Sequence, residues 1–456
     1  MIARKAEELI HDFFLHSKRA LLVTGARQVG KTFSIRKVGK ECFENVVEIN
    51  FLEQPDAIEL FGGQKGAKDL LLRLSAFTKK RLIPGKTLIF FDEVQECKDI
   101  VTAIKFLVDE GSYQYVMSGS LLGVELDDLR SVPVGYVDEI EMFPLDLLEF
   151  FSAIGMGVGV IEHLRQCFKL KCPVDEFVHN RMLEAIKLYL IVGGMPAVVQ
   201  KYLDTNNLRR VYEEQRGIIR AYKKDITKYD TGHKLQIEEI YELIPSEINA
   251  KNKRFILKEL NEKARFSKYE DSFLWLTNTG VAIPVYNVEE PRIPLLLNRQ
   301  RNLFKLFVND VGLLAAMYGG NMQTRLLGQN PNINFGSVFE NLVAQELYAH
   351  GFSENGLHSL YYFNSKKQGE LDFVVEQDGC VLPIEVKSGK DYERHNALTN
   401  VMRNEGYCIP EAYTFCHENV HTNEKVTYYP IYMIAFFEQH QIEENEYKFD
   451  LTGLGT

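Results

Sequence analysis

Two short stretches contain residues whose types and spacing suit phosphate chemistry, and they lie far apart in the sequence. The first is GARQVGKT at residues 25–32. Its glycines, lysine and threonine have the spacing G-x-x-x-x-G-K-T, which is typical of loops that bind nucleotide phosphates. The second is GELDFVVEQDGCVLPIEVKSGK at residues 369–390. It contains two carboxylates and a lysine, which suit a divalent metal held against a phosphodiester.

The first stretch lies between an expected strand and an expected helix. RALLVTG before it is a short apolar run, typical of a buried parallel strand, and KTFSIRKVGK after it can begin a helix. This order directs backbone N–H groups and the positive end of a helix dipole toward one place. The residues predicted to surround the phosphates are Gly25, Ala26, Arg27, Gln28, Val29, Gly30, Lys31 and Thr32.

Individual roles follow from residue type. Gly25 and Gly30 permit the turn and a close backbone approach. Lys31 would neutralise the β- and γ-phosphates, and the Thr32 hydroxyl would bind Mg²⁺. The expected ligands are therefore ATP and Mg²⁺. The alternative is a chance glycine turn, which the flanking elements disfavour.

TLIFFDEVQ at residues 87–95 predicts a buried strand that ends in Asp92 and Glu93. Ligands of open α/β sheets bind at the carboxyl ends of strands, which places these acids beside the phosphate loop. Asp92 would hold Mg²⁺ through water, and Glu93 would polarise the attacking water. The alternative is a strand whose acidic end simply enters solvent.

A further strand is expected at YQYVMSGS, residues 113–120. It ends in small polar residues, and either Ser118 or Ser120 would sense the γ-phosphate from the neighbouring strand. An ordinary exit from strand to loop explains the pattern equally well.

The second stretch predicts a β-hairpin that carries a metal site. Apolar runs on both sides of QDG indicate two antiparallel strands. Glu385 and Lys387 share a face because alternate strand residues point the same way, and the expected register places Asp372 beside Glu385. The carboxylates would bind one or two metals, and Lys387 would orient the attacking water. A solvated strand face is the alternative.

A helix is expected just before the hairpin, at residues 335–351. Glu340 lies next to the apolar stripe of this helix, where it would add a third carboxylate to the metal site, although an ordinary surface acid would look the same. Because charges within the apolar strand VLPIEV need a purpose, we favour an intact metal site formed by Glu340, Asp372 and Glu385 over a relic.

The bulk composition is that of a soluble, multidomain protein. The chain has 456 residues, 45% hydrophobic and 25% charged, which suggests about two to four domains. No apolar run approaches the roughly 18–20 residues of a membrane span, and MIARKAEELIHDFF indicates an amphipathic helix rather than a signal peptide. Seven dispersed cysteines without a Cys-x-x-Cys pair indicate reduced thiols in the cytoplasm and no zinc site.

The motifs resemble those of a known family. GARQVGKT, LIFFDEVQ, YVMSGSLLG and FPLDLLEF (143–150) resemble the AAA-type P-loop ATPases of a prokaryotic family with a C-terminal DUF4143 region. The resemblance continues in order through YLIVGGMPAVVQ, AYKKDITKY, FKLFVNDVGLLAA and GSVFENLVAQELY, and so covers nearly the whole chain. The hairpin has the D-x(12)-E-x-K arrangement of PD-(D/E)xK nucleases, which fits the family's C-terminal region.

One departure from the family pattern concerns the arginine finger, the residue that would stabilise transition-state charge. The family usually has Gly-Arg shortly before the Pro-Leu segment, whereas this chain has Gly135 and Tyr136. Arg130 is the nearest substitute, and an exposed loop arginine is its better explanation.

The resemblance and the motifs imply an α/β fold with four parts. These are a parallel-sheet AAA-type ATPase core at 1–150, a helical connector at 151–205, a winged-helix-like domain at 206–320 and a restriction-endonuclease-like domain at 321–456. Residues 201–310 contain 20 Lys and Arg against 16 Asp and Glu, with the basic cluster KNKRFILK at 251–258, whereas the whole chain has a net charge of −10. This local excess favours DNA contacts, although a solvated helical face explains it slightly better. Trp275 is expected in the core.

Three functions remain open from the sequence. The first is an ATP-driven DNA-processing protein in which nucleotide state controls access to the C-terminal site. The second is an ATP-dependent switch or remodeller of protein partners whose nuclease-like domain only binds. The third, a nucleotide-binding regulator with negligible turnover, is disfavoured by the complete ATP motifs. The expected partners are ATP, ADP and DNA, with a homo-oligomer as one alternative to a monomer, and no membrane.

Overall fold

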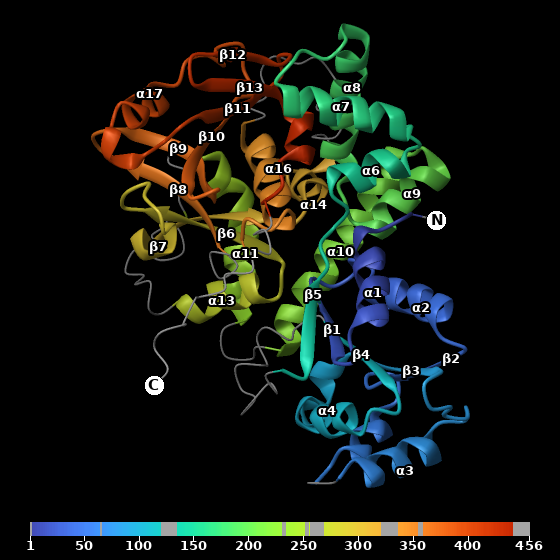
Figure 1. Ribbon diagram of the computed structural model, residues 1–456. Helices are drawn as coiled ribbons and strands as arrows, with labels where there is room; N and C mark the ends of the chain where they lie inside the picture. Colours follow the sequence, from blue (N-terminus) through green and yellow to red (C-terminus); the bar gives the residue numbers. More distant parts are fainter. Residues whose placement is uncertain are drawn as a thin grey trace, which may run out of the picture.

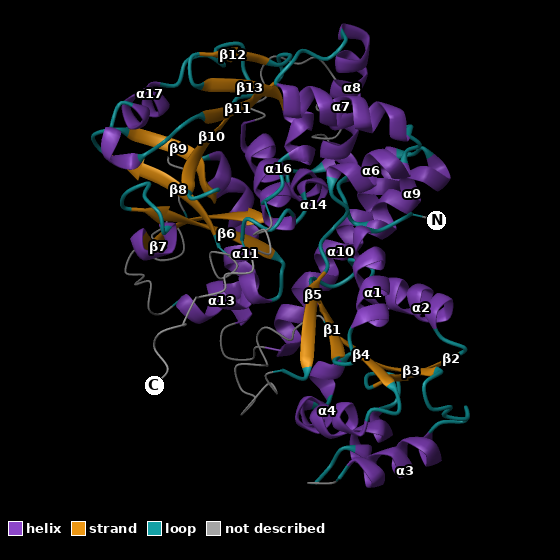
Figure 2. Ribbon diagram, viewed as in Figure 1, coloured by secondary structure: helices purple, strands orange, loops and turns teal. Residues whose placement is uncertain are grey.

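The computed structural model describes residues 2–63, 66–119, 135–229, 234–250, 255, 269–320, 336–353 and 359–440. The chain forms a parallel-sheet domain at the N-terminal end, a helical middle part and a C-terminal domain built on a second sheet (Figure 1). This α/β architecture confirms the expected fold class. Figure 2 shows the two sheets separated by helices.

The N-terminal sheet has five parallel strands in the order β2-β3-β4-β1-β5. Helices α1 and α2 cover one face, and α3 and α4 cover the other (Figure 1). Strand β3 is buried at every position, because its alternate residues pack on opposite faces: Leu88 and Phe90 toward α1 and α2, Ile89 and Phe91 toward α3 and α4. The elements are α1 (Lys5–His16), β1 (Ala20–Thr24), α2 (Lys31–Cys42), β2 (Asn45–Asn50), α3 (Ala67–Phe77), β3 (Thr87–Asp92), α4 (Lys98–Glu110), β4 (Gln114–Ser118) and β5 (Val137–Glu141).

The middle part is helical, and its helix ends follow recognisable sequence rules. Helix α6 begins at a capping box formed by Asp146 and Glu149. Helix α8 ends before Gly193, and α9 begins with Pro196 in its first turn, which are positions that favour glycine and proline. The helices are α6 (Leu147–Ala153), α7 (Val158–Leu170), α8 (Glu176–Val192), α9 (Pro196–Thr205), α10 (Leu208–Tyr229), α11 (Lys234–Asn249), α13 (Glu270–Asn278) and α14 (Val311–Met317).

The C-terminal sheet has eight strands in the order β12-β13-β11-β10-β9-β8-β6-β7. It contains the antiparallel hairpin of β9 and β10 that the sequence predicts, and β10 continues into a parallel pairing with β11. The elements are β6 (Ala282–Val288), β7 (Arg299–Val308), α16 (Gly336–Ala349), β8 (Leu360–Ser365), β9 (Gly369–Gln377), β10 (Cys380–Val386), α17 (Asn396–Met402), β11 (Ala412–Cys416), β12 (His421–Asn423) and β13 (Val426–Pro430). Short 3₁₀ turns lie at Pro55–Leu60, Val94–Glu96, Leu295–Asn298, Glu405–Tyr407 and Ile431–Phe436.

Strands β6 and β7 belong to this C-terminal sheet, although the sequence places them in the middle part. Helix α13 leads through a left-handed Gly280 into β6. β6 then pairs in parallel with β8, which lies beyond the expected domain limit at 320. The sheet is therefore continuous across that limit, and the division into four domains stays a prediction.

Helix α16 lies at the centre of the C-terminal domain (Figure 1). The sequence predicts one apolar face, but every residue from Ser337 to Tyr348 is buried. The buried polar side chains bind distant backbone groups: Asn341 pairs with both the N–H and the carbonyl of Val308, and Gln345 accepts from the N–H of Val311. Such pairing offsets the cost of burying polar atoms.

Of the helices described, none has by itself the length and apolar character of a membrane span. Helices α8 and α9 taken together have the length and composition of such a span, but the two helices are bent by 117° relative to each other.

Candidate functional site

The phosphate loop follows β1 and leads into α2, as the sequence predicts. Gly25 has φ +122°, and a Cβ there would lie 2.1 Å from the carbonyl oxygen of Met142, so only glycine fits. Gly30 has φ +101° and forms the N-cap of α2. The loop thus curls around the N-terminus of this helix, where backbone N–H groups lack helical partners.

Lys31 is buried inside the loop. Its Nζ donates to the carbonyl oxygens of Gly25 at 2.8 Å and Ala26 at 2.9 Å. Burial lowers the pKa of Lys31 to about 8, against the attraction of Glu93 and Asp92. The ammonium group is therefore held where a phosphate would exchange for the two carbonyls.

Asp92, at the end of β3, is the centre of a polar cluster. Its carboxylate accepts from the Thr32 hydroxyl at 3.1 Å, from the Asn50 amide at 3.1 Å and from the Ser118 hydroxyl. Burial raises the pKa of Asp92, and the hydrogen bonds from Ser118 and Thr32 oppose this rise. Ser118, expected as a sensor of the γ-phosphate, contacts Asp92 itself.

The cluster fits a magnesium ion. Mg²⁺ takes oxygen ligands in a tight octahedron and usually keeps several waters, so it is held by few protein groups. The Thr32 hydroxyl lies within hydrogen-bonding distance of the Asp92 carboxylate, and the oxygen atoms of both groups are suitable Mg²⁺ ligands. Asn50 was not expected here. Its place at the carboxyl end of a strand beside β3 is the pattern that would have found it.

Glu93 directly follows Asp92 and has a left-handed backbone with φ 57°. This region is uncommon for a residue with a side chain and is often found at functional sites. The Gln95 side-chain amide donates to Glu93 at 2.5 Å and holds the carboxylate in place. The sequence analysis did not identify Gln95, because a glutamine two residues after an acid carries no distinctive pattern.

Arg27 connects the loop to the helical middle part. Its guanidinium pairs with Asp225 of α10, and the Tyr222 hydroxyl donates to its backbone carbonyl at 3.1 Å. Both partners lie in AYKKDITKY, whose contact with the loop could not be seen from spacing. Arg27 was expected among the nucleotide ligands, and its side chain is here engaged by a protein carboxylate.

In the C-terminal domain the hairpin brings Asp372, Glu385 and Lys387 together. Ile384 pairs with Phe373, so the next positions on the two strands are Glu385 and Asp372, as expected. The N–H of Val386 donates to Asp372 at 2.9 Å, and the Lys387 ammonium donates to Glu385 at 2.6 Å. Both carboxylates are buried.

Glu340 lies in α16 and is 1% exposed, so it is no surface acid. Within the described part of the chain, however, no group of three or more His, Cys, Asp or Glu residues is arranged to hold a metal. The residues as placed therefore do not fit a three-ligand metal centre, and the expected set of Glu340, Asp372 and Glu385 stays a prediction.

The remaining residues singled out in the sequence lie either in the core or outside the described part of the chain. Trp275 is buried in the core, as predicted. Ser120, Arg130 and the basic cluster 251–258 except for Phe255 lie outside the described residues.

Comparison with known proteins assigns three regions. An AAA domain matches residues 17–151. Two domains of unknown function follow, DUF8612 at 183–324 and DUF4143 at 335–432. The chain carries an AAA-type P-loop ATPase domain and a C-terminal DUF4143 region. The phosphate loop and the Asp92 cluster lie in the AAA domain, and the Asp372 hairpin lies in the DUF4143 region. No curated protein matches the chain.

Several solved structures are distantly similar. A Walker-type ATPase of Pyrococcus abyssi is 14% identical, over 70% of this chain and 96% of that one, with a TM-score of 0.43. The ORC1 protein of Aeropyrum pernix in complex with DNA is 12% identical, over 72% and 94%, with a TM-score of 0.27. RuvB of Thermotoga maritima is 13% identical, over 72% and 96%, with a TM-score of 0.29. Because these TM-scores are all below 0.5, the similarities do not indicate a function for this chain.

Proposed function

We propose that this protein binds and hydrolyses ATP at the AAA domain and that its nucleotide state controls DNA binding or cleavage at the Asp372 hairpin. The observation that carries the second half is the convergence of two buried carboxylates, Asp372 and Glu385, with Lys387 on the paired strands β9 and β10, in the register expected for a D-ExK site. Buried charges on a sheet are costly and are retained where they serve a purpose.

In the ATP half of the proposal each residue has one task. Lys31 leaves the loop carbonyls to bind the β- and γ-phosphates, and the loop N–H groups bind the remaining oxygens. Thr32 and Asp92 would hold Mg²⁺, which would supply positive charge to the phosphates. Glu93, steadied by Gln95, orients the attacking water and accepts its proton.

In the DNA half, the hairpin acids and Lys387 face a phosphodiester. Lys387 is the group suited to orient the attacking water. In this structure its Nζ donates to the Glu385 carboxylate at 2.6 Å. The basic cluster 251–258 and the excess of basic residues in 201–310 are the proposed DNA contacts of the middle part.

The test is cleavage of single- and double-stranded DNA with Mg²⁺ or Mn²⁺, with and without ATP, comparing the wild type with Asp372→Ala and Lys387→Ala. The proposal expects cleavage that responds to ATP and is lost in both variants, while ATP hydrolysis is unchanged. Equal cleavage by wild type and variants would indicate a contaminant or another site.

A second function is favoured by one specific observation. The Lys387 ammonium forms an ion pair with the Glu385 carboxylate, and the described residues contain no group of three or more His, Cys, Asp or Glu side chains arranged to hold a metal. An ATP-dependent switch or remodeller of protein partners, with an inactive hairpin that only binds, would have this arrangement. It expects ATP hydrolysis without DNA cleavage under any of the conditions above.

A further inference from the structure

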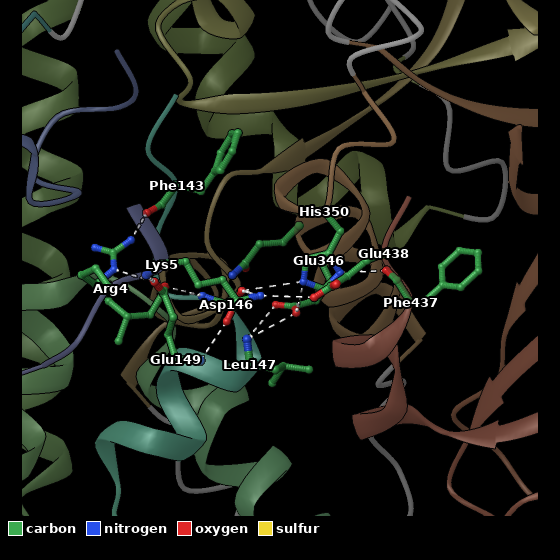
Figure 3. Close-up of polar contacts among 12 residues, drawn as sticks. Arg4, Lys5, Phe143, Asp146, Leu147, Glu149, Glu346, His350, Phe437 and Glu438 are labelled. Atoms are coloured by element: carbon green, nitrogen blue, oxygen red, sulfur yellow. Dashed lines mark hydrogen bonds and ion pairs between the residues drawn. The ribbon is translucent and has the colours of Figure 1, made fainter. Parts of the chain in front are cut away.

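Arg4 lies before α1 and outside the matched AAA domain, yet its side chain contacts the phosphate loop. Figure 3 shows Arg4 beside Phe143 and Glu149. The side chain is buried, and the guanidinium donates to Val29 at 2.8 Å, to Phe143 at 2.6 Å and to Glu149 at 3.1 Å. The first two acceptors are backbone carbonyls, and Val29 belongs to the loop. A planar guanidinium has its donors in a fixed fork, so it sets the directions of all three acceptors at once.

The contact with Val29 has a geometric consequence for the loop. In a trans peptide the carbonyl and the N–H point in opposite directions, so an N–H on Gly30 faces away from Arg4 when the Val29 carbonyl faces it. Gly30 has φ +101°, and glycine adopts either sign of φ with little cost. The contact with Arg4 therefore restrains a peptide that glycine leaves free to rotate, and it keeps the N–H of Gly30 on the side away from Arg4.

The contact of Arg4 with Glu149 begins a series of contacts that reaches the DUF4143 region. Glu149 accepts from Arg4 and also from the backbone N–H of Lys5 at 2.6 Å. It shares the capping box of α6 with Asp146, whose carboxylate pairs with the Lys5 ammonium at 2.7 Å.

Helix α16 completes the chain of contacts (Figure 3). The Nε2 atom of His350 lies 3.8 Å from Asp146, and Glu346 accepts from the N–H of Leu147 at 3.2 Å. Glu346 lies in the last turn of α16, the helix that also carries Glu340, and His350 directly follows the end of this helix. The phosphate loop is thus linked to the DUF4143 region through a polar network of buried side chains and backbone groups, in which the Lys5 side chain alone is exposed.

Burial of this many charges argues for a role beyond holding two domains together. Replacing a buried ion pair by apolar residues of similar size is often neutral or stabilising. An interface that only holds two domains together could therefore be apolar. Buried ionic groups are best attested where they impose one particular arrangement. Here that arrangement includes a loop carbonyl.

We propose that Arg4 is a positioning residue for ATP binding, which holds the Val29–Gly30 peptide and ties the phosphate loop to Glu346 of α16 and to His350 just after that helix. Arg4 touches neither nucleotide nor the reacting atoms and acts through the loop. This inference rests on the proposed ATP site, and it adds a residue outside the AAA domain to that site.

The first test measures ATP affinity with a fluorescent ATP analogue, together with kcat and KM of hydrolysis, on the full-length protein. Arg4→Met removes all three donors, and Arg4→Lys retains the charge but not the fork. Arg19→Met is the matched control, because Arg19 pairs with Asp138 on the exposed face of the same domain. We expect Kd and KM for ATP to rise about tenfold or more in Arg4→Met, less in Arg4→Lys, and to stay within about twofold in Arg19→Met.

A merely structural role would reduce the active fraction, and hence kcat, without changing Kd or KM. Unchanged values of Kd and KM in Arg4→Met would overturn the inference. If Arg4→Met does not fold, Arg4→Lys decides by the same criterion. A wild type that fails to bind ATP would instead contradict the proposed ATP site itself, so the two failures are distinguishable.

The second test addresses the tie to α16 with a double-mutant cycle on ATP affinity, combining Arg4→Lys with Glu346→Gln. Coupled residues give effects that do not add, and we expect the double variant to depart from additivity by more than about threefold. Glu411→Gln, which removes a surface pair with Lys171, replaces Glu346→Gln in the control cycle and should be additive. Additivity within twofold for the Glu346 cycle would overturn the tie.

Discussion

At the scale of single residues, Lys31 shows how burial would prepare a group for the phosphate that we propose it binds. The ammonium group is already desolvated and bound to two loop carbonyls, so little additional solvent must be removed when phosphate replaces them. The same burial has a cost, because it favours the neutral amine and lowers the pKa to about 8.

A pH dependence of ATP binding follows. In the proposed ATP site phosphate binds the charged form of Lys31, and the free protein loses that charge as pH rises through about 8. Affinity for ATP should therefore be nearly constant from pH 7 to 8 and then fall by up to about tenfold per pH unit. Titrations with a fluorescent ATP analogue between pH 7 and 9.5 measure this. Lys31→Ala should not bind at any pH, and Lys31→Arg, which stays charged, should lack the fall. The same fall in Lys31→Arg would assign it to another group.

At the scale of elements, α16 shows how a helix can be polar in sequence and buried in the fold. Its glutamates, asparagine and glutamine would normally mark a solvated face. Here Asn341 and Gln345 bind backbone groups of β7 and of the turn into α14. The helix therefore positions the polypeptide around it as well as packing against the sheet.

Asn341→Leu tests that role. The substitution conserves size but leaves the N–H and carbonyl of Val308 without their side-chain partner, which should destabilise the fold by about 1–3 kcal/mol. Urea unfolding followed by fluorescence gives the change. Asn400→Leu on the exposed surface of α17 is the control and should stay within about 0.5 kcal/mol of wild type. A loss no larger in Asn341→Leu than in the control would mean that these bonds are replaced by others.

At the scale of the whole molecule, the buried charges between the AAA domain and the DUF4143 region make stability depend on pH. Burial raises the pKa of Glu346 to about 8, and the groups that face it are Asp146, His350 and Lys5. The folded state thus holds a proton that the unfolded state loses near pH 4.5. Stability from this group is present at low pH and declines as pH rises from about 4.5 to about 8.

Glu346→Gln should remove this decline, because the amide cannot ionise. The unfolding temperature of the variant relative to wild type should rise steadily between pH 5 and 8 and then level off. Thermal unfolding across this range measures the difference. A constant difference at all pH values would show that Glu346 does not titrate in this window.

The sequence predicted local features well and long-range ones poorly. The phosphate loop, the buried strand ending in Asp92 and the hairpin register of Asp372 and Glu385 all follow from short periodic patterns and turn residues. The parallel pairing of β6 with β8 leaves no local pattern, so the sheet could not be joined across residue 320. Arg4 was missed for the same reason, since its partner Glu149 lies 145 residues away.

The most direct test of the central claim is the affinity of the protein for a DNA duplex in different nucleotide states. Fluorescence anisotropy with Mg²⁺ would compare the nucleotide-free, ADP-bound and ATPγS-bound wild type with Lys31→Ala. We expect the wild-type affinity to change severalfold between ADP and ATPγS, and the Lys31→Ala affinity to be the same in all three states. A wild type that binds ATPγS but has the same DNA affinity in every state would contradict the coupling of the two sites.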